Sequence, residues 1–222
     1  MGLASSSTAL IAKGMEMCYG VYEAGWDGVA NIAICGLENS GKTSLCLQLR
    51  RSEERPRPTG MEDCLKVNQM SSMRVNEWVL KVGQNQRELH VHDLGGKPEF
   101  HMMWTKRFIN VLCVVFVIDA SEPQIFHTNV ITTYKKFILP HLLATRVPIL
   151  FVLTKNDLVG EGRKMVAGVT PAMLKEGLGL EKEETAPDQY DIVETSSLTK
   201  EGIPELLDSA VQLLQDFKKK VE

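Results

Sequence analysis

The chain has no excess of basic residues, and that absence narrows what it can bind. Lysine and arginine together number 25 against 28 aspartates and glutamates, which gives a net charge of −3. Nucleic-acid-binding surfaces depend on clustered basic side chains that neutralise phosphates. The longest basic run, Lys218 to Lys220, is typical of a solvated helix end. We therefore expect no nucleic-acid partner.

Long apolar runs are also missing. The longest, Val111 to Ile118, has the length of a strand and falls far short of the ~20 residues that a membrane-spanning helix needs. The apolar patch from Ala9 to Ala12 is too short for a secretory signal. We therefore expect a cytoplasmic protein, either free or attached to a membrane from the cytosolic side.

Cysteine use gives no sign of a disulfide framework or a metal site. The five cysteines are an odd number without metal-ligand spacing. Cys35 and Cys113 fall inside apolar runs, where a reduced cysteine acts as a small hydrophobic residue. This pattern fits a reducing compartment. With 222 residues and 44% hydrophobic content, the chain can form one α/β domain with extensions.

Strand-like and helix-like patterns alternate along the chain, which predicts an α/β fold with a doubly wound, mostly parallel sheet. We expect the domain over 29–219, after an N-terminal extension of 1–28. The third helix is expected to begin at Ser121 as N-cap and to stop before Pro140. The strands are predicted at 29–35, 78–82, 88–93, 111–118, 148–153 and 190–194, and the helices at 42–51, 99–108, 123–139, 171–177 and 204–219.

The most informative motif is the segment Gly36–Thr43, which matches G-x-x-x-x-G-K-[ST] between a predicted strand and a predicted helix. Backbone N–H groups and the helix dipole make such a turn an anion cradle. Lys42 is expected to reach the β- and γ-phosphates of a nucleotide, and the Thr43 hydroxyl to ligate Mg²⁺. The remaining expected phosphate contacts come from Glu38, Asn39, Ser40, Gly41 and Ser44.

Two further motifs follow predicted strands, at the sheet edge where ligands bind in such folds. Asp93 ends a strand and can hold Mg²⁺ through its water shell, and the Gly96 N–H can meet a γ-phosphate with no side chain in the way. Asp157 can accept two hydrogen bonds from the edge of guanine, which adenine cannot donate. The stem of Lys155, next to Thr154, can lie along the base.

A fourth motif, Glu194–Leu198, gives a weaker signal, because many strands end in serine and threonine. After Ser196, a backbone N–H at Ser197 or Leu198 is expected to donate to the guanine carbonyl.

Taken together, the motifs at 36–43, 58–60, 93–97, 154–157 and 194–198 resemble those of the Ras-like small GTPases. Glu38, the Asp-x-Gly-Gly sequence at Asp93 and Trp104, which lies seven residues after Lys97, are most similar to the ADP-ribosylation factor and factor-like branch. The resemblance implies a P-loop NTPase fold with six strands, one of them antiparallel, and helices on both faces. It also implies a GTP/GDP switch that uses Mg²⁺.

The family resemblance implies partners as well. An effector would bind the switch regions, an exchange factor and an activating protein would act on the nucleotide, and a role in membrane or ciliary traffic follows by family analogy only.

The chain departs from the family at three positions of the site. Thr154 stands where Arf proteins have asparagine, which other small GTPases replace with threonine, so guanine is still the expected base. Lys97 replaces the glutamine that orients the attacking water, and an ammonium can only donate hydrogen bonds. Very slow hydrolysis follows, with the Lys97 charge either paired to the γ-phosphate or turned to solvent. Thr59 matches the switch threonine that closes on Mg²⁺, although its surroundings differ from the family pattern, and Ser71 or Ser72 is the alternative ligand.

The N-terminus reads Met1-Gly2-Leu3-Ala4-Ser5-Ser6, which fits a myristoylation motif at Gly2. One myristoyl chain binds membranes only marginally, so a second signal is needed for stable attachment.

Three functions compete at this stage: a regulatory GTPase, a GTP-binding scaffold without meaningful turnover, and a P-loop kinase. The kinase leaves Asp157 without a role and is the weakest of the three.

Overall fold

The computed structural model describes residues 29–53, 76–82, 87–160, 167–182 and 186–221. The predictions for Gly2, Thr59, Ser71 and Ser72 lie outside the described residues, as does the extension 1–28.

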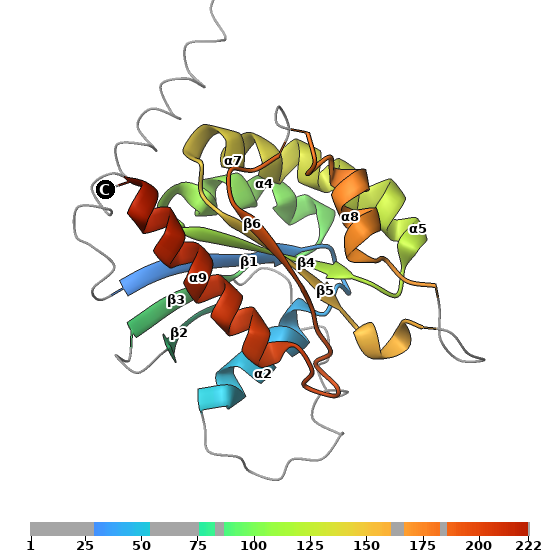
Figure 1. Ribbon diagram of the computed structural model, residues 1–222, viewed down its shortest axis with the longest axis horizontal. Coiled ribbons are helices and arrows are strands. Elements are labelled where there is room, and N and C mark those ends of the chain that lie inside the picture. The colour runs from blue at the N-terminus through green and yellow to red at the C-terminus, as the bar shows by residue number, and fades with distance from the viewer. Residues whose placement is uncertain (1–28, 54–75, 83–86, 161–166, 183–185, 222) are drawn as a thin grey trace, which may run out of the picture.

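Six strands of the described chain form one sheet in the order β2-β3-β1-β4-β5-β6 (Figure 1). Neighbouring strands are parallel except β2 and β3, which pair antiparallel. This confirms the predicted mostly parallel, doubly wound sheet. The strands are β1 Val29–Gly36, β2 Asn76–Val82, β3 Arg87–Asp93, β4 Cys113–Asp119, β5 Ile149–Thr154 and β6 Tyr190–Glu194.

Helices cover both faces of the sheet (Figure 1). α2 and α9 lie on one face, and the helices from α4 to α8 lie on the other. The longer helical segments are α2 Lys42–Glu53, α4 Pro98–Arg107, α8 Pro171–Leu178 and α9 Ile203–Val221, with short 3₁₀ turns at η1 Phe108–Asn110 and η4 Asn156–Leu158. A further helical segment from Pro123 to Thr145 consists of α5 Pro123–Ile125, η2 Phe126–Val130, α6 Ile131–Thr133, η3 Tyr134–Ile138 and α7 Leu139–Thr145.

The central strand β4 explains the long apolar run in the sequence. Phe116 and Ile118 point into the core on the face of α4 to α8, whereas Val115 and Val117 point into the core beneath α2 and α9. All four are buried. A strand with both faces covered must be apolar at every position, as parallel strands between helix layers are.

The helical segment after β4 runs further than predicted. It continues through Pro140 to Thr145, so the expected stop before Pro140 is wrong. Proline disrupts an α-helix because it lacks an N–H and its ring meets the carbonyl four residues earlier. Here the preceding turn η3 has the wider π-helical form, and Pro140 occupies the first turn of α7. Proline is tolerated in the first turn of a helix, because the N–H that it lacks would have no partner within the helix there.

The start of this helical segment also differs from the prediction. The helix begins at Pro123, and Glu122 occupies the N-cap position without a side-chain cap bond. Ser121 is therefore not the N-cap. Its hydroxyl donates instead to the carboxylate of Asp119, at 2.6 Å. A serine side chain can bond a group that precedes it in the chain as well as the helix N–H groups that follow it.

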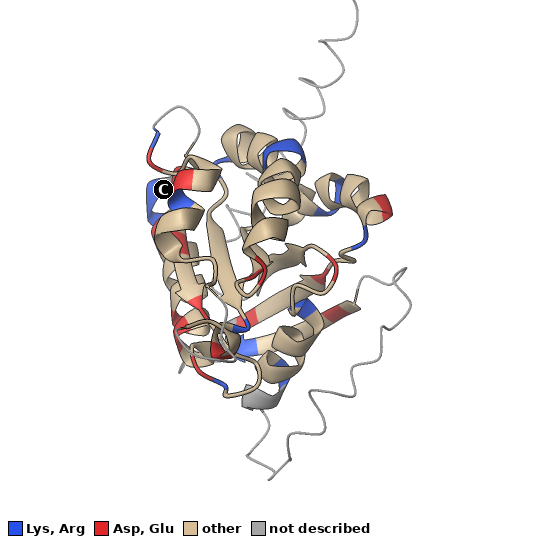
Figure 2. Cartoon of the chain, turned by 90° about the vertical axis from the view of Figure 1, so that its right-hand side faces the viewer, with Lys and Arg blue, Asp and Glu red and all other residues tan. Residues whose placement is uncertain are grey.

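Charges of both signs are interspersed on the face that Figure 2 shows. The three lysines 218–220 end α9, where Lys219 and Lys220 are exposed and Lys219 pairs with Asp216 at 3.2 Å. This agrees with a solvated helix end. Over the part of the chain that the structure describes, no helix combines the length and hydrophobicity that crossing a bilayer requires.

Truncating the centre of the sheet tests this core. Phe116 is fully buried and packs against the rings of Tyr134 and Phe151. We expect Phe116→Ala to lower the free energy of unfolding by about 3–5 kcal/mol, because the ring contacts are lost and a cavity remains. Urea denaturation measures this loss. The control Val79→Ala removes an exposed side chain of β2, so it is expected to change stability by less than about 0.5 kcal/mol.

Candidate functional site

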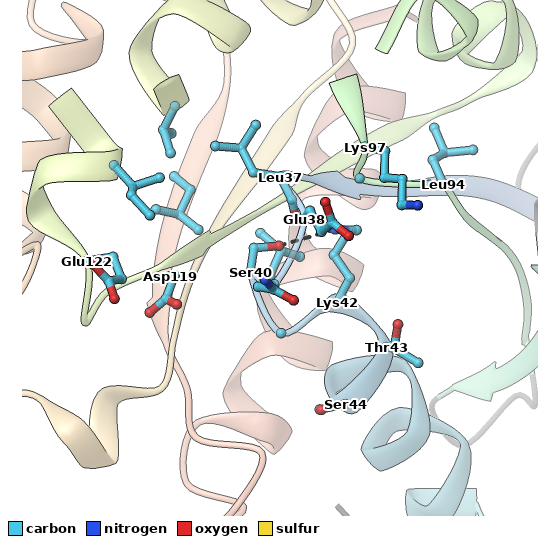
Figure 3. A pocket seen from close by; sticks show the side chains of 18 of the residues that line it. Leu37, Glu38, Ser40, Lys42, Thr43, Ser44, Leu94, Lys97, Asp119 and Glu122 are labelled. Carbon is cyan, nitrogen blue, oxygen red and sulfur yellow. Dashed lines mark hydrogen bonds between the residues drawn. The ribbon is translucent and has the colours of Figure 1, made fainter. Parts of the chain in front are cut away.

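A cavity of about 890 Å³ opens at the carboxyl edge of the sheet. Its wall combines the turn between β1 and α2, the segment after β3, and the ends of β4 and β5 (Figure 3). An apolar side is added by α5 and η2. Residues of the predicted site that line it are Glu38, Asn39, Ser40, Gly41, Lys42, Thr43, Ser44, Asp93, Gly96, Lys97 and Lys155.

The turn between β1 and α2 is possible only because of its glycines. Gly36 has a φ of +153°, and a Cβ there would stand 2.3 Å from the carbonyl oxygen of Val117 on β4. The chain therefore passes tightly against the neighbouring strand before it turns back into α2 at Lys42. The first N–H groups of a helix have no partner within the helix, so this end of α2 faces the cavity as an anion-binding element.

Lys42 brings a buried positive charge into this element. Its ammonium donates to the Leu37 carbonyl at 2.5 Å and to the Ser40 hydroxyl at 3.3 Å. Burial lowers the pKa of Lys42, because the ammonium loses hydration, and the Asp93 carboxylate is the strongest influence in the opposite direction. An anion in the cavity would restore the stabilisation that hydration gave. The arrangement therefore favours a negatively charged ligand.

Asp93 is the acidic counterpart of Lys42 at the end of β3. Burial raises the pKa of Asp93, while the Asn76 amide, at 3.5 Å, and the charge of Lys42 act against that shift. Thr43 is exposed at the start of α2 and lines the same cavity. A carboxylate and a hydroxyl beside an anion site suit Mg²⁺, which takes few protein oxygens and keeps several waters.

Two side chains of α4 hold the loop after Asp93. The Trp104 indole donates to the Gly95 carbonyl at 2.9 Å, and the His101 ring nitrogen Nε2 lies 3.0 Å from the Gly96 carbonyl, to which it must donate. Both side chains are buried. A Cβ at Gly96 would stand 2.7 Å from the backbone carbonyl of Leu37, which cannot move aside as a side chain can, so the position requires glycine. The loop is thus held against the turn that carries Lys42.

Lys97 has the extended backbone that Pro98 predicts, with φ −70° and ψ 146°, and occupies the N-cap position of α4. Its side chain lines the cavity, at the same wall as Glu38 and Lys42 (Figure 3). Two lysines therefore face the space where an anion is expected.

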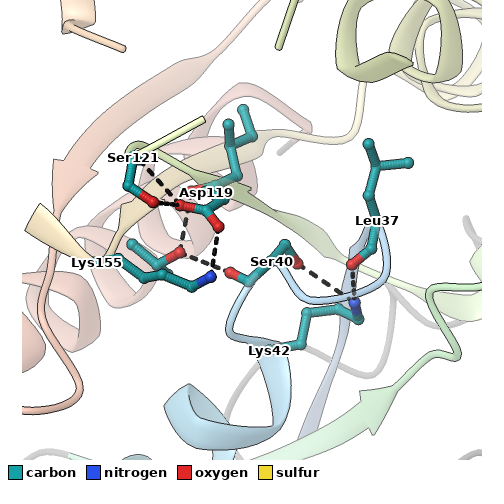
Figure 4. A network of polar contacts seen from close by, with 8 residues as sticks. Leu37, Ser40, Lys42, Asp119, Ser121 and Lys155 are labelled. Carbon is teal, nitrogen blue, oxygen red and sulfur yellow. Dashed lines mark hydrogen bonds and ion pairs between the residues drawn. The ribbon is translucent and has the colours of Figure 1, made fainter. Parts of the chain in front are cut away.

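Thr154 connects the two halves of the site. It is buried at the end of β5, and its hydroxyl lies 2.6 Å from the Ser40 carbonyl and 3.1 Å from the Ile118 carbonyl (Figure 4). These contacts fix the turn after β1 to the ends of β4 and β5. Thr154 therefore contacts the turn between β1 and α2 through its hydroxyl group.

The segments after β5 and β6 come together beside this junction. The Asp157 carboxylate accepts a hydrogen bond from the Ser196 hydroxyl at 2.5 Å. The Ser196 oxygen in turn accepts from the Leu198 N–H at 3.2 Å, and Gln48 of α2 donates to the Ser197 carbonyl at 2.8 Å. Asp157 and Ser196, which are 39 positions apart in the chain, therefore lie together at this edge of the sheet.

Sequence reasoning missed four residues that the structure brings to this region. Asp119 and Ser121 pair with each other beside Lys155, His101 holds the loop at Gly96, and Gln48 reaches Ser197. Asp119 had a usable signal, because it ends a continuous apolar strand at the ligand-binding edge. For His101 and Gln48, nothing in the local pattern distinguishes them from ordinary polar residues of a helix.

Comparisons with known proteins agree with one another. Residues 23–214 match the model of the ADP-ribosylation factor family. The chain is 27% identical over 186 residues to ADP-ribosylation factor-like protein 6 of Caenorhabditis briggsae, which covers 83% of this chain and 84% of that protein. It is also 27% identical over 129 residues to ADP-ribosylation factor-like protein 3 of Caenorhabditis elegans. That match covers 58% of this chain and 61% of the relative.

Solved structures show the same fold. The Arl6 BBS3 small GTPase from Trypanosoma brucei, with the bound nucleotide analogue GppNp, superposes with a TM-score of 0.58 at 23% identity, over 87% of this chain and 99% of that one. The mammalian SRP receptor gives a TM-score of 0.59 at 18% identity, over 82% and 99%. At these identities the likeness concerns the fold alone.

The junction at Thr154 can be tested by removing its hydroxyl. We expect Thr154→Val to lower the free energy of unfolding by about 1–3 kcal/mol, because the replacement keeps the volume but removes buried hydrogen bonds. Urea denaturation measures the change. Thr132→Val is the matched control, since its hydroxyl is exposed and donates to the Thr128 carbonyl of its own helical segment, at 2.9 Å. Equal losses in the two variants would contradict the assigned role of Thr154.

Proposed function

The chain belongs to the ADP-ribosylation factor family, and we propose that it is an Arf-like GTP/GDP switch whose intrinsic hydrolysis is very slow. One observation carries the proposal most directly. The cavity that holds the buried Lys42 and Asp93 is also lined by Lys155, two positions before Asp157, whose carboxylate accepts from the Ser196 hydroxyl. This juxtaposition suits a ligand with a polyphosphate at one end and a guanine base at the other.

The triphosphate is proposed to lie in the turn between β1 and α2. Lys42 would bind the β- and γ-phosphates, and the amide of Gly96 would meet the γ-phosphate where no Cβ stands in the way. The other proposed contacts are Glu38, Asn39, Ser40, Gly41, Thr43 and Ser44, which line the cavity.

Magnesium fits the oxygen ligands of this site. Thr43 and Asp93 would hold it together with phosphate oxygens and water, and Thr59 is the proposed third protein ligand. When bound, the ion supplies neutralisation of phosphate charge. The assignment is supported by the position of Asp93 and Thr43, which line the same cavity and offer a carboxylate and a hydroxyl oxygen.

The base is proposed to bind at the junction of the segments after β5 and β6. Asp157 would accept from the N1–H and N2–H₂ groups of guanine, and its carboxylate keeps further acceptor positions beside the bond from Ser196. Lys155 would supply an aliphatic stem along the base, while Thr154 positions the phosphate turn. Backbone groups at Ser197 and Leu198 are the proposed partners of the guanine carbonyl.

Slow turnover follows from Lys97. Catalysis of phosphoryl transfer to water depends on a residue that orients the water, and glutamine does this by donating and accepting at once. The ammonium group of a lysine donates hydrogen bonds but has no lone pair with which to accept one from the water. Because Lys97 lines the cavity, we propose that its charge faces the γ-phosphate and prolongs the GTP state.

A GTP-binding scaffold without meaningful turnover is the second candidate. The placement of Lys97 on the cavity wall favours it as well, since a second ammonium near the phosphates adds affinity without adding chemistry. The two candidates differ in whether bound GTP is ever converted to GDP.

Partners and location are proposed by family analogy. An effector would bind the switch regions of the GTP form, an exchange factor would release GDP, and an activating protein would be needed for turnover. The domain is proposed to span 29–219, with 1–28 as a membrane-binding extension that carries myristate on Gly2. A role in membrane or ciliary traffic is proposed on the same analogy.

Base recognition provides the test of the proposed function. The purified protein is expected to bind fluorescent GDP in the presence of magnesium, and Asp157→Asn is expected to weaken this binding roughly a hundredfold or more. The same variant should gain affinity for xanthosine diphosphate, because the asparagine amide can donate to the extra carbonyl of xanthine. Asp208→Asn, an exposed change on α9, serves as control. Unchanged GDP binding by Asp157→Asn would refute the assignment.

Turnover is tested at Lys97. We expect Lys97→Gln to speed single-turnover GTP hydrolysis on the order of tenfold or more, because glutamine restores an acceptor for the water. Lys106→Gln removes an exposed lysine from the same helix and should leave the rate unchanged. An unaltered rate in Lys97→Gln would remove the argument from water orientation. Chromatography of the nucleotide released from the wild-type protein separates the candidates, since GTP retained over days indicates the scaffold.

A further inference from the structure

The carboxylate of Asp119 is fully engaged by its neighbours. One oxygen accepts from the Ser121 N–H at 2.9 Å and from the Ser121 hydroxyl at 2.6 Å, and the other accepts from the Lys155 ammonium at 2.5 Å (Figure 4). The Asp119 side chain is mostly buried, with 13% of its surface exposed. A carboxylate whose two oxygens are both bound in this way is suited to holding other groups in place.

Lys155, whose ammonium Asp119 binds, has an unfavourable backbone conformation. Its backbone has φ 60° and ψ 32°, the left-handed conformation that costs a residue with a Cβ about 1–2 kcal/mol. Such conformations persist where the surrounding structure fixes them, and they are concentrated at ligand sites. The Asn156 N–H donates to the Thr195 carbonyl at 3.1 Å, which fixes the backbone after Lys155, but only Asp119 fixes the far end of its side chain among the described contacts.

We infer that Asp119 is a positioning residue for nucleotide binding, and the inference rests on the proposed function. By holding the ammonium of Lys155 at the end of β4, it keeps the aliphatic stem extended along the cavity wall. The stem then forms a preformed apolar surface for the purine. Ser121 supports the same arrangement by fixing the orientation of the carboxylate.

The expected benefit is preorganisation. A lysine side chain carries about 2 kcal/mol of rotamer entropy, which is lost when a ligand immobilises it. If the ion pair with Asp119 has already ordered the stem, less is lost on binding. Affinity differences among variants of one site appear mainly in the dissociation rate. The prediction is therefore a faster release of nucleotide when Asp119 is changed.

Release of fluorescent GDP from the full chain, with magnesium present, is the measurement. We expect Asp119→Asn to speed release about tenfold, because asparagine keeps the size of the side chain but lacks the negative charge that strengthens the bond to the ammonium. Ser121→Ala should change the rate in the same direction by a smaller factor. Release at the wild-type rate from Asp119→Asn would overturn the inference.

A double-variant comparison separates positioning from a general structural role. Lys155→Met keeps an unbranched apolar stem and removes the ammonium. If Asp119 acts through Lys155, then Asp119→Asn adds no further change to the release rate of Lys155→Met. Effects that multiply in the double variant would show that Asp119 acts independently of Lys155, and would contradict the proposal.

Two controls keep the outcomes distinct. Asp216→Asn breaks another aspartate–lysine pair, with Lys219 on α9, and should leave release unchanged. Thermal unfolding shows whether each variant folds. If Asp119→Asn does not fold, the release rate of Ser121→Ala becomes the test. A wild-type protein that binds no GDP would refute the proposed function, whereas normal binding with an unaffected Asp119→Asn refutes only the role of Asp119.

Discussion

The burial of the Lys42 ammonium is the constraint on which the site depends. A charged group taken out of water must find compensation, and here it finds a carbonyl at Leu37, a hydroxyl at Ser40 and the charge of Asp93. These groups come from separate elements, so the turn after β1 and the end of β3 must stay in register. A polyphosphate would complete the compensation. The glycines at 36 and 96 allow the backbone to approach closely enough for this.

The sheet brings the rest of the site to the same edge. Because β1, β3, β4, β5 and β6 are parallel, their carboxyl ends meet, and each ends in a segment with polar side chains. Thr154 bonds the phosphate turn to β4 and β5, and Ser196 bonds the segment after β6 to Asp157. The proposed phosphate and base sites are thus linked by buried hydrogen bonds. A change in one is expected to be felt in the other.

The proposal of slow turnover rests on Lys97 and on the loop that carries it. Two side chains of α4 hold the loop before Lys97, Trp104 at the Gly95 carbonyl and His101 at the Gly96 carbonyl, and Pro98 restricts the Lys97 backbone. The local geometry for an attacking water can therefore be intact while the residue that should orient it is not. This is the physical basis for proposing a protein that binds GTP firmly and converts it slowly.

The sequence by itself predicted the fold class and the alternation of strands and helices along the chain. It also predicted many of the residues that line the cavity, because phosphate cradles and strand-end carboxylates carry local signals. Only the tertiary structure decided the course of the helical segment through Pro140, the partner of Ser121 and the contacts of Asp119, His101 and Gln48. A π-helical turn precedes the proline, which stands in the first turn of α7, and no local pattern in the sequence indicates this arrangement. Asp119 and Lys155 are 36 residues apart, and only the pairing of β4 with β5 makes them neighbours.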